Sequence, residues 1–131
     1  MSVFEIRVAI TAKDYDKLVT FYRDGLGLDP GDAWAENGRG QLCDAGAGVL
    51  EILDEEHAAS VDAIEVGEPV SGPIRFAFRV PDLHTAVENA RRYGATVLRE
   101  PTRTPWNDLN ARVVAPDGMQ ITLFQVLDES E

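Results

Sequence analysis

The sequence predicts an α+β fold of two tandem βαβββ modules, which form one curved eight-stranded mixed sheet with helices on its convex side. An internal repeat supports this prediction: EIRVAITAKDYDKLVTFYRDGLG, from Glu5, aligns with PIRFAFRVPDLHTAVENARRYGA, from Pro73. Each copy has the pattern of a strand, a turn and a helix, and three short strand patterns follow it. A module this small cannot bury its own sheet face, so we expect the two modules to share one sheet.

The first element of each copy is predicted to be a strand, because apolar side chains alternate with other types. The apolar positions are Phe4, Ile6, Val8 and Ile10 in the first copy, and Ile74, Phe76, Phe78 and Val80 in the second. We expect this face to be core. The opposite face carries Arg7 in the first copy and Arg75 in the second.

A helix is predicted after each of these strands. Asp14 and Asp82 stand at the N-cap positions, where a carboxylate can accept hydrogen bonds from the first turn. Apolar residues then recur at helical spacing, and Gly25 and Gly94 are expected to end the two helices.

The remaining strands and the linker follow from short apolar runs bounded by turn residues. The predicted strands are Ala33–Glu36, Gly40–Asp44, Val49–Leu53, Thr96–Arg99, Asn110–Ala115 and Gln120–Val126. Module one then covers residues 1–54 and module two residues 73–131, in a single domain of residues 1–131. The acidic segment 55–72 is the expected linker, with one or two helical turns around Glu56–Ile64.

The composition narrows the classes of partner. The chain has 23 acidic residues against 12 Lys and Arg, and a net charge of -11, so we expect neither a nucleic-acid nor a membrane-surface partner. No apolar run is long enough to span a bilayer, and the N-terminus does not resemble a signal peptide. The single cysteine, Cys43, fits a reducing compartment and is expected to be a buried structural thiol, so we expect a cytoplasmic protein. The acidity by itself favours solubility or a cationic ligand.

The stretches VAITAKDYDKLVTFYRDGLGL, FAFRVPDLHTAVENARRYGA and APDGMQITLFQ resemble the vicinal oxygen chelate superfamily. That superfamily includes glyoxalase I, extradiol dioxygenases, and fosfomycin- and bleomycin-resistance proteins. The resemblance implies a homodimer with pockets near the interface. It also implies that the four positions that bind a divalent ion in metal-dependent members fall on Arg7, Glu51, Arg75 and Thr122.

Those four residue types do not suit a metal. Arginine is a permanent cation without a lone pair to donate, and Glu51 with Thr122 is too small a ligand set for a tight site. We therefore expect no metal and no cofactor, as in the metal-free, bleomycin-binding branch. That branch also suggests that Trp34, Trp106 and, by strand parity, Phe124 line a ligand groove; the alternative for the tryptophans is packing in the sheet or dimer core.

Three functions are compatible with this pattern. The first is a metal-independent protein that binds a small molecule. The second is a metal-free lyase or isomerase with Glu51 as general base and Arg7 and Arg75 stabilising an oxyanion. The third, a glyoxalase- or dioxygenase-like metalloenzyme, is disfavoured by the two arginines. The arginines either pair with Glu51 or face an anionic group of the ligand, and the sequence leaves both readings open.

The two histidines give no sign of a catalytic arrangement. His57 lies in the acidic linker, where we expect a solvated loop. His84 lies on the second predicted helix and is expected to be exposed. Neither is placed as the base of a nucleophilic mechanism.

Overall fold

The computed structural model describes residues 3–127, so the outermost residues of the predicted domain, 1–2 and 128–131, lie outside it. The strands of the first half are β1 (Glu5–Ala12), β2 (Asp29–Trp34), β3 (Gly40–Asp44) and β4 (Val49–Asp54). Those of the second half are β5 (Ile74–Arg79), β6 (Thr96–Arg103), β7 (Asp108–Val114) and β8 (Gln120–Val126). The helices are α1 (Tyr15–Thr20), which continues into a π-helical turn (Phe21–Gly25), α2 (Glu55–Glu65) and α3 (Leu83–Arg92).

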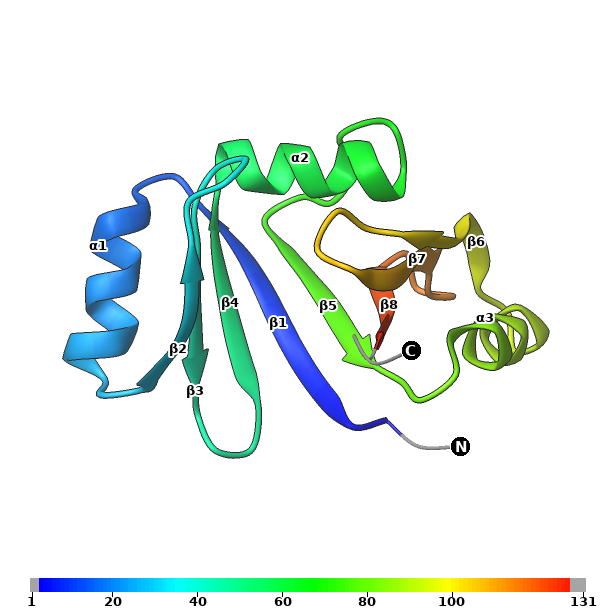
Figure 1. Ribbon diagram of the computed structural model, residues 1–131, viewed down its shortest axis with the longest axis horizontal. Helices are drawn as coiled ribbons and strands as arrows, with labels where there is room; N and C mark the ends of the chain where they lie inside the picture. Colours follow the sequence, from blue (N-terminus) through cyan, green and yellow to red (C-terminus); the bar gives the residue numbers. More distant parts are fainter. Residues whose placement is uncertain (1–2, 128–131) are drawn as a thin grey trace.

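All eight strands belong to one mixed sheet in the order β2-β3-β4-β1-β5-β8-β7-β6. The pairs β1–β4 and β5–β8 are parallel and the other pairs are antiparallel. The two halves therefore repeat the same topology and meet at β1 and β5 (Figure 1). This confirms the α+β fold with an eight-stranded mixed sheet.

Two separate apolar cores lie on the outer face of the sheet. In the first half Val19 of α1 packs with Cys43 and Ile52. In the second half α3 packs on β7 and β8 through Leu83 and Leu123, among others. Both helices begin as predicted, because Asp14 and Asp82 accept hydrogen bonds from backbone N–H groups three residues later.

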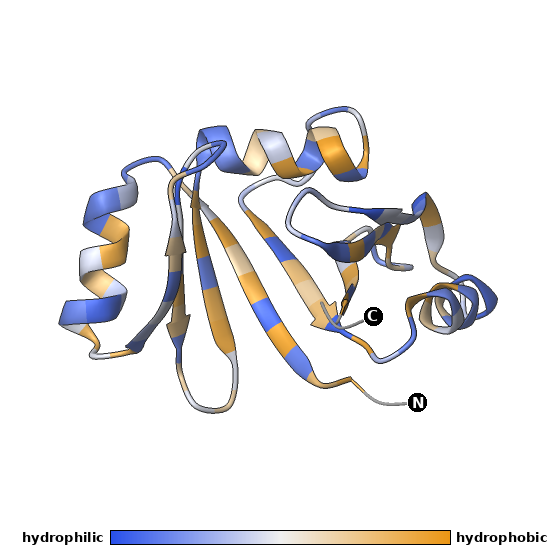
Figure 2. Cartoon of the chain, in the orientation of Figure 1, coloured by the Kyte–Doolittle hydropathy of each residue, from blue (hydrophilic) through white to orange (hydrophobic). Residues whose placement is uncertain are grey.

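The centre of the outer face differs from the expectation that its apolar residues are core. Hydrophobic and hydrophilic residues alternate along β1 and β5 (Figure 2), as the parity predicts. However, Ile6 is 37% exposed and Ile74 is 46% exposed, and Phe4, which precedes β1, is 59% exposed. The reason is that α1 and α3 each cover only their own half, so the middle of the sheet lies between them (Figure 1).

Several strand limits also differ from the predicted ones. The second strand spans Asp29–Trp34 rather than Ala33–Glu36, and the strand from Thr96 continues to Arg103. Both are edge strands, where Pro30 and Pro101 are tolerated because an edge strand has backbone groups that need no ladder partner. The strand predicted at Asn110–Ala115 is β7, which begins two residues earlier, at Asp108.

The expected linker contains a full helix, α2, rather than a turn or two. Its N-cap Asp54 accepts a hydrogen bond from the backbone N–H of His57 at 2.8 Å. One face of α2 buries His57, Val61, Asp62 and Glu65, which recur at helical spacing. The expectation of a solvated loop at His57 is therefore wrong, whereas His84 is exposed and Cys43 is buried, as predicted.

The position of α2 also departs from the expectation that helices lie on the convex side. It contacts the first half of the sheet through β4 and β1 and the second half through β6 and β7, and lies across one end of the sheet in Figure 1. Through His57, Val61 and Glu65 it contributes to the concave side. None of the helices described has the length and hydropathy of a membrane span.

Candidate ligand-binding site

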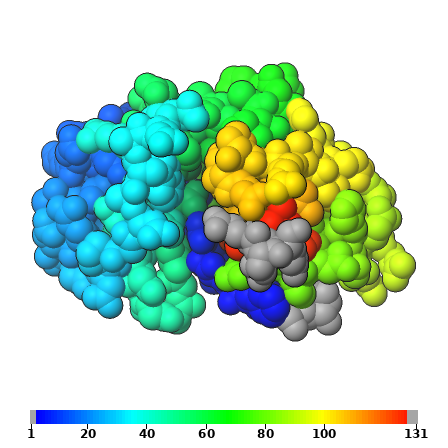
Figure 3. All heavy atoms as spheres, in the orientation of Figure 1, coloured from blue at the N-terminus to red at the C-terminus, as the bar shows by residue number. Residues whose placement is uncertain are grey.

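The concave side of the sheet encloses a cavity of about 590 Å³. Figure 3 shows the molecule hollowed between the β2–β3 side and the β6–β7 side. All seven residues selected from the sequence line this cavity: Arg7, Trp34, Glu51, Arg75, Trp106, Thr122 and Phe124. A cavity of this volume accommodates a drug-sized molecule.

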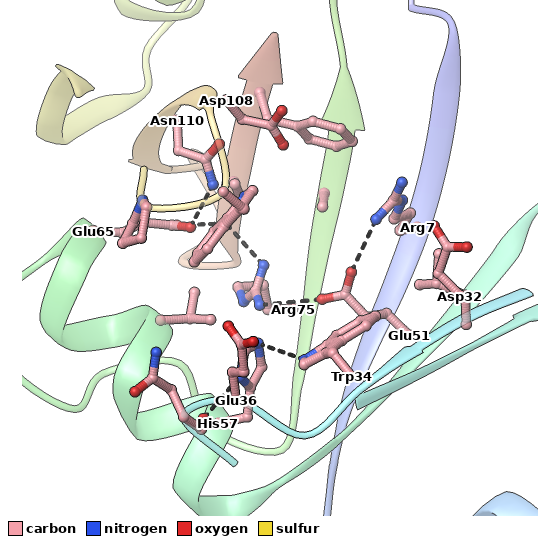
Figure 4. Close-up of a pocket in the computed structure, with 18 of the residues that line it drawn as sticks. Arg7, Asp32, Trp34, Glu36, Glu51, His57, Glu65, Arg75, Asp108 and Asn110 are labelled. Atoms are coloured by element: carbon pink, nitrogen blue, oxygen red, sulfur yellow. Dashed lines mark hydrogen bonds and ion pairs between the residues drawn. The ribbon is translucent and has the colours of Figure 1, made fainter. Parts of the chain in front are cut away.

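At the centre of the cavity, Glu51 lies between the two arginines (Figure 4). Its Oε2 accepts a hydrogen bond from Arg7 Nη1 at 3.3 Å, and its Oε1 lies 3.8 Å from Arg75 Nη2. Arg7 also forms an ion pair with Glu5, at 2.8 Å. Burial by itself lowers the pKa of Arg7, but Glu5 and Glu51 outweigh burial and raise that pKa above its ordinary value. The arginines are therefore partners of carboxylates that the chain itself supplies.

The four positions assigned to metal ligands do not fit a divalent ion. Two of them carry guanidinium groups, which have no lone pair to donate and repel a cation. The carboxylate of Glu51 faces these two groups, and the hydroxyl of Thr122 accepts a hydrogen bond from Arg75 Nη1 at 2.8 Å. Across residues 3–127, no three His, Cys, Asp or Glu side chains are grouped to hold a metal ion elsewhere.

A buried polar network extends from this centre to α2. The hydroxyl of Thr122 donates to Glu65 Oε1 at 2.7 Å, and Arg112 Nε donates to the same oxygen at 3.0 Å. Arg112 is fully buried and also donates to Asp62 Oδ1 at 3.2 Å. Each charge in this network has an opposite partner, whose attraction offsets the desolvation penalty that an isolated buried ion would carry.

Asp62 joins the end of α2 to the segment that returns to β5. Its Oδ2 accepts hydrogen bonds from the backbone N–H groups of Val70 and Ser71 at 2.9 and 3.1 Å. Burial alone raises the pKa of Asp62, but the hydrogen bonds from Ser71 and Val70 and the charge of Arg112 lower it below its usual range. Asp62 is therefore held as a carboxylate in the folded chain.

Sequence reasoning missed this network, although two signals were present. On β7, Asp108, Asn110 and Arg112 alternate with apolar residues, which predicts a polar inner face. On α2, Asp62 and Glu65 are three residues apart and share a helix face. The interpretation of residues 55–72 as a solvated linker hid the second signal.

One wall of the cavity is formed around Trp34. Its Nε1–H donates to His57 Nε2 at 3.2 Å, and His57 Nδ1 lies 2.9 Å from the carbonyl oxygen of Asn37. These partners assign a neutral imidazole with the proton on Nδ1. The indole ring lies directly over Gly40, where a Cβ atom would be 2.0 Å from the ring. Trp34 is thus positioned by a histidine and a glycine that the sequence did not connect with it.

The opposite wall is formed by β7, β8 and the turn before β7. Trp106, in this turn, is 44% exposed and lines the cavity. Phe124 lies beneath the guanidinium of Arg7, with 5.1 Å between the guanidinium carbon and the ring centroid. Burial raises the pKa of the Asp108 carboxyl, against the opposing influence of Arg7, Trp106 and Arg79.

The sequence matches the model of the Glyoxalase/Bleomycin resistance protein/Dioxygenase superfamily over residues 6–123. The chain belongs to this superfamily. No curated protein matches it in sequence.

Solved structures of other proteins share the superfamily fold. A hypothetical protein from Bacillus halodurans C-125 is 16% identical with a TM-score of 0.73, over 100% of this chain and 99% of the other. Methylmalonyl-CoA epimerase from Mycobacterium tuberculosis is 19% identical with a TM-score of 0.64, over 98% and 89% of the two chains. A superfamily member from Vibrio splendidus 12B01 is 14% identical with a TM-score of 0.62, over 96% and 100%. At these identities the likeness concerns the fold alone.

Proposed function

We propose that this superfamily member is a metal-independent protein that binds a small molecule in its concave cavity. The observation that supports it most directly is the position of Glu51 between Arg7 and Arg75. Side chains of the chain itself interact where metal-dependent relatives would bind an ion. The two tryptophan-bearing walls then offer apolar surface to an aromatic or aliphatic ligand body.

The alternative is a metal-free lyase or isomerase; one solved structure with this fold is named as an epimerase. In that reaction Glu51 would accept a proton and the arginines would stabilise an oxyanion on the substrate. Both carboxylate oxygens of Glu51 face guanidinium groups, and Arg75 also donates to Thr122. Because these groups face one another rather than the open cavity, binding without turnover is the function that we favour.

Fluorescence titration tests the proposal. Protein dialysed against EDTA is titrated with three aromatic probes: proflavine, acridine orange and 8-anilinonaphthalene-1-sulfonate. We expect at least one probe to bind at one site per chain. Zn²⁺, Ni²⁺ or Mn²⁺ should change its affinity by less than about twofold, which corresponds to about 0.4 kcal/mol and is the smallest difference that such a titration resolves. Absence of binding, or binding that appears only after metal is added, would overturn the proposal.

A matched pair of variants locates the binding site. Trp106→Ala removes an aromatic side chain from the cavity wall, and Tyr93→Ala removes one that is 80% exposed and does not line the cavity. We expect Trp106→Ala to weaken binding about two- to tenfold, which corresponds to the usual worth of one aromatic contact, and Tyr93→Ala to leave it unchanged. Equal effects of the two substitutions would place the probe outside the cavity.

A further inference from the structure

The orientation of the Asn110 amide is determined by its neighbour. Asn110 lines the cavity from β7 and is 6% exposed. Its Nδ2 donates to Glu65 Oε2 at 2.9 Å. An ionised carboxylate can only accept hydrogen bonds, so the reverse orientation of the amide would place two acceptors against each other. The Asn110 oxygen, Oδ1, therefore points away from Glu65 (Figure 4).

That oxygen is an exception within the buried network. Of the buried side-chain nitrogen and oxygen atoms in the described part of the chain, it is the one that has no hydrogen-bond partner. A buried acceptor without a donor costs free energy, and natural proteins leave few of them. Asn110 lines the cavity, but its Oδ1 has almost no exposed surface, so a donor on a bound molecule can supply the missing hydrogen bond where the wall shifts enough to uncover this oxygen.

Asp108 provides a second acceptor beside it. It lies two residues before Asn110 on β7, on the same face of the sheet, and also lines the cavity. Burial raises the pKa of Asp108 and outweighs the charge of Arg7, the hydrogen bond from Trp106 and the charge of Arg79, which all lower it. The wall therefore presents a neutral and an anionic oxygen, with the ring of Trp106 in the adjoining turn.

The distribution of charge in the cavity favours a cation. The positive charges of Arg7 and Arg75 are opposed by Glu5 and Glu51, and Arg112 by Glu65 and Asp62. Three further carboxylates line the cavity without an ion pair in residues 3–127: Asp32, Glu36 and Asp108. The charges of Arg7 and Arg79 also act on Asp108, but carboxylates outnumber arginines among the lining residues, so a ligand meets net negative charge.

We propose that Asn110 Oδ1 and the Asp108 carboxylate form a subsite for a cationic ligand group that carries N–H donors, such as an aromatic amine, an amidine or a guanidine. This inference deepens the proposed function and rests on it. The subsite selects for two properties together, positive charge and hydrogen-bond donors, while the aromatic walls contact the body of the ligand.

Two planar acridinium dyes separate these properties. Proflavine carries two NH₂ groups, and acridine orange carries dimethylamino groups at the same positions, so they differ in exocyclic donors at equal charge. We expect the wild-type chain to bind proflavine about three- to tenfold more tightly than acridine orange, which is the usual effect of satisfying one buried acceptor. We expect it to bind the anionic 8-anilinonaphthalene-1-sulfonate more weakly than either dye. This comparison needs no variant, so it does not depend on how a substitution folds.

Asn110→Thr tests the acceptor. The threonine hydroxyl can still donate toward Glu65, whereas the amide oxygen is lost. We expect the preference for proflavine to fall below about twofold, because the amide oxygen that accepts from its NH₂ groups is lost. The affinity for acridine orange should stay within about twofold of wild type, because its dimethylamino groups have no N–H to donate. A preference that persists in this variant would overturn the role of Asn110.

Asp108→Asn and Asp32→Asn test the charge at two places in the cavity. Each removes one negative charge, the first from the subsite and the second from an exposed position on β2. We expect Asp108→Asn to weaken proflavine binding about three- to tenfold and Asp32→Asn less than about twofold, since exposed charge contacts are weak. Equal effects would mean that the dye senses only the overall charge, and would overturn the subsite.

The outcomes distinguish this inference from the proposed function. Equal affinity for the two dyes, or tighter binding of the anionic probe, combined with a loss on Trp106→Ala, would refute the subsite and leave the binding function in place. Absence of binding by all three probes would refute both.

Discussion

Replacement of Glu51 by glutamine should destabilise the fold, because it removes the carboxylate that faces two guanidinium groups. Arg7 retains Glu5 as a partner, at 2.8 Å, but the buried Arg75 retains only its hydrogen bond to Thr122. The cost therefore falls mainly on Arg75, whose side chain is 6% exposed and lies 3.8 Å from the Glu51 carboxylate.

The magnitude follows from that distance and from the exposure of the cavity. Two unit charges at 3.8 Å interact by about 4 kcal/mol at an effective dielectric constant of roughly 20. Breaking a fully buried pair costs about 3–5 kcal/mol. Glu51 is 13% exposed and lines a cavity open to water, so we expect roughly half of this value, about 2 kcal/mol.

Urea denaturation measures this loss. With an m-value of about 1–3 kcal/mol per M, the unfolding midpoint should fall by roughly 0.7–2 M. The matched control is Glu5→Gln, which removes a carboxylate that is 25% exposed and leaves Arg7 paired with Glu51; it should cost less than about 1 kcal/mol. The double variant with Arg75→Met should recover about 2 kcal/mol relative to additivity, because no unpaired charge remains.

Two results would refute this reasoning. A Glu51→Gln variant within about 0.5 kcal/mol of wild type would mean that the carboxylate does not stabilise the arginines. Strict additivity with Arg75→Met would mean that Arg75 and Glu51 do not interact, and the account of the metal-ligand positions would then lose its basis.

Three further predictions concern other parts of the molecule. Gly40→Ala should displace the Trp34 ring and change its fluorescence, because the new Cβ would overlap the indole. Gly48→Ala should leave the spectrum unchanged, because a Cβ there would lie 3.6 Å from its nearest neighbour. A change of the fluorescence in both variants or in neither would contradict the packing. The folded-state pKa of Asp62 lies below its ordinary 3.8, so its contribution to stability is present above about pH 4 and is lost as the pH falls through the folded value. The Asp62→Asn variant should therefore be less stable than wild type at pH 7, and its free energy of unfolding should change less with pH below about pH 4. Urea denaturation at a series of pH values measures this, and an equal pH dependence of the two proteins would disprove it. Sedimentation at micromolar concentration should give twice the chain mass of 14.4 kDa, since apolar residues at the centre of the outer face are exposed, and a monomer would refute the predicted homodimer.

Local sequence patterns were sufficient for the fold and for the direction in which the main site residues point. The repeat that begins at Glu5 and Pro73 predicted the duplicated topology, and period-two alternation predicted that Arg7 and Arg75 lie opposite the apolar face. The pattern of each strand and helix depends on residues within a few positions of one another, so it can be recognised from the sequence alone.

The partners of those residues were decided only by the tertiary structure. Glu65 reaches Asn110, Arg112 and Thr122, which are 45, 47 and 57 positions away along the chain. The sequence determined that two arginines face the concave side. It did not determine that neighbouring carboxylates neutralise them, or that, within the described residues, Asn110 Oδ1 has no hydrogen-bond donor. Charge pairing depends on distances of a few ångströms between distant segments, and those distances exist only after α2 packs across the two halves of the sheet.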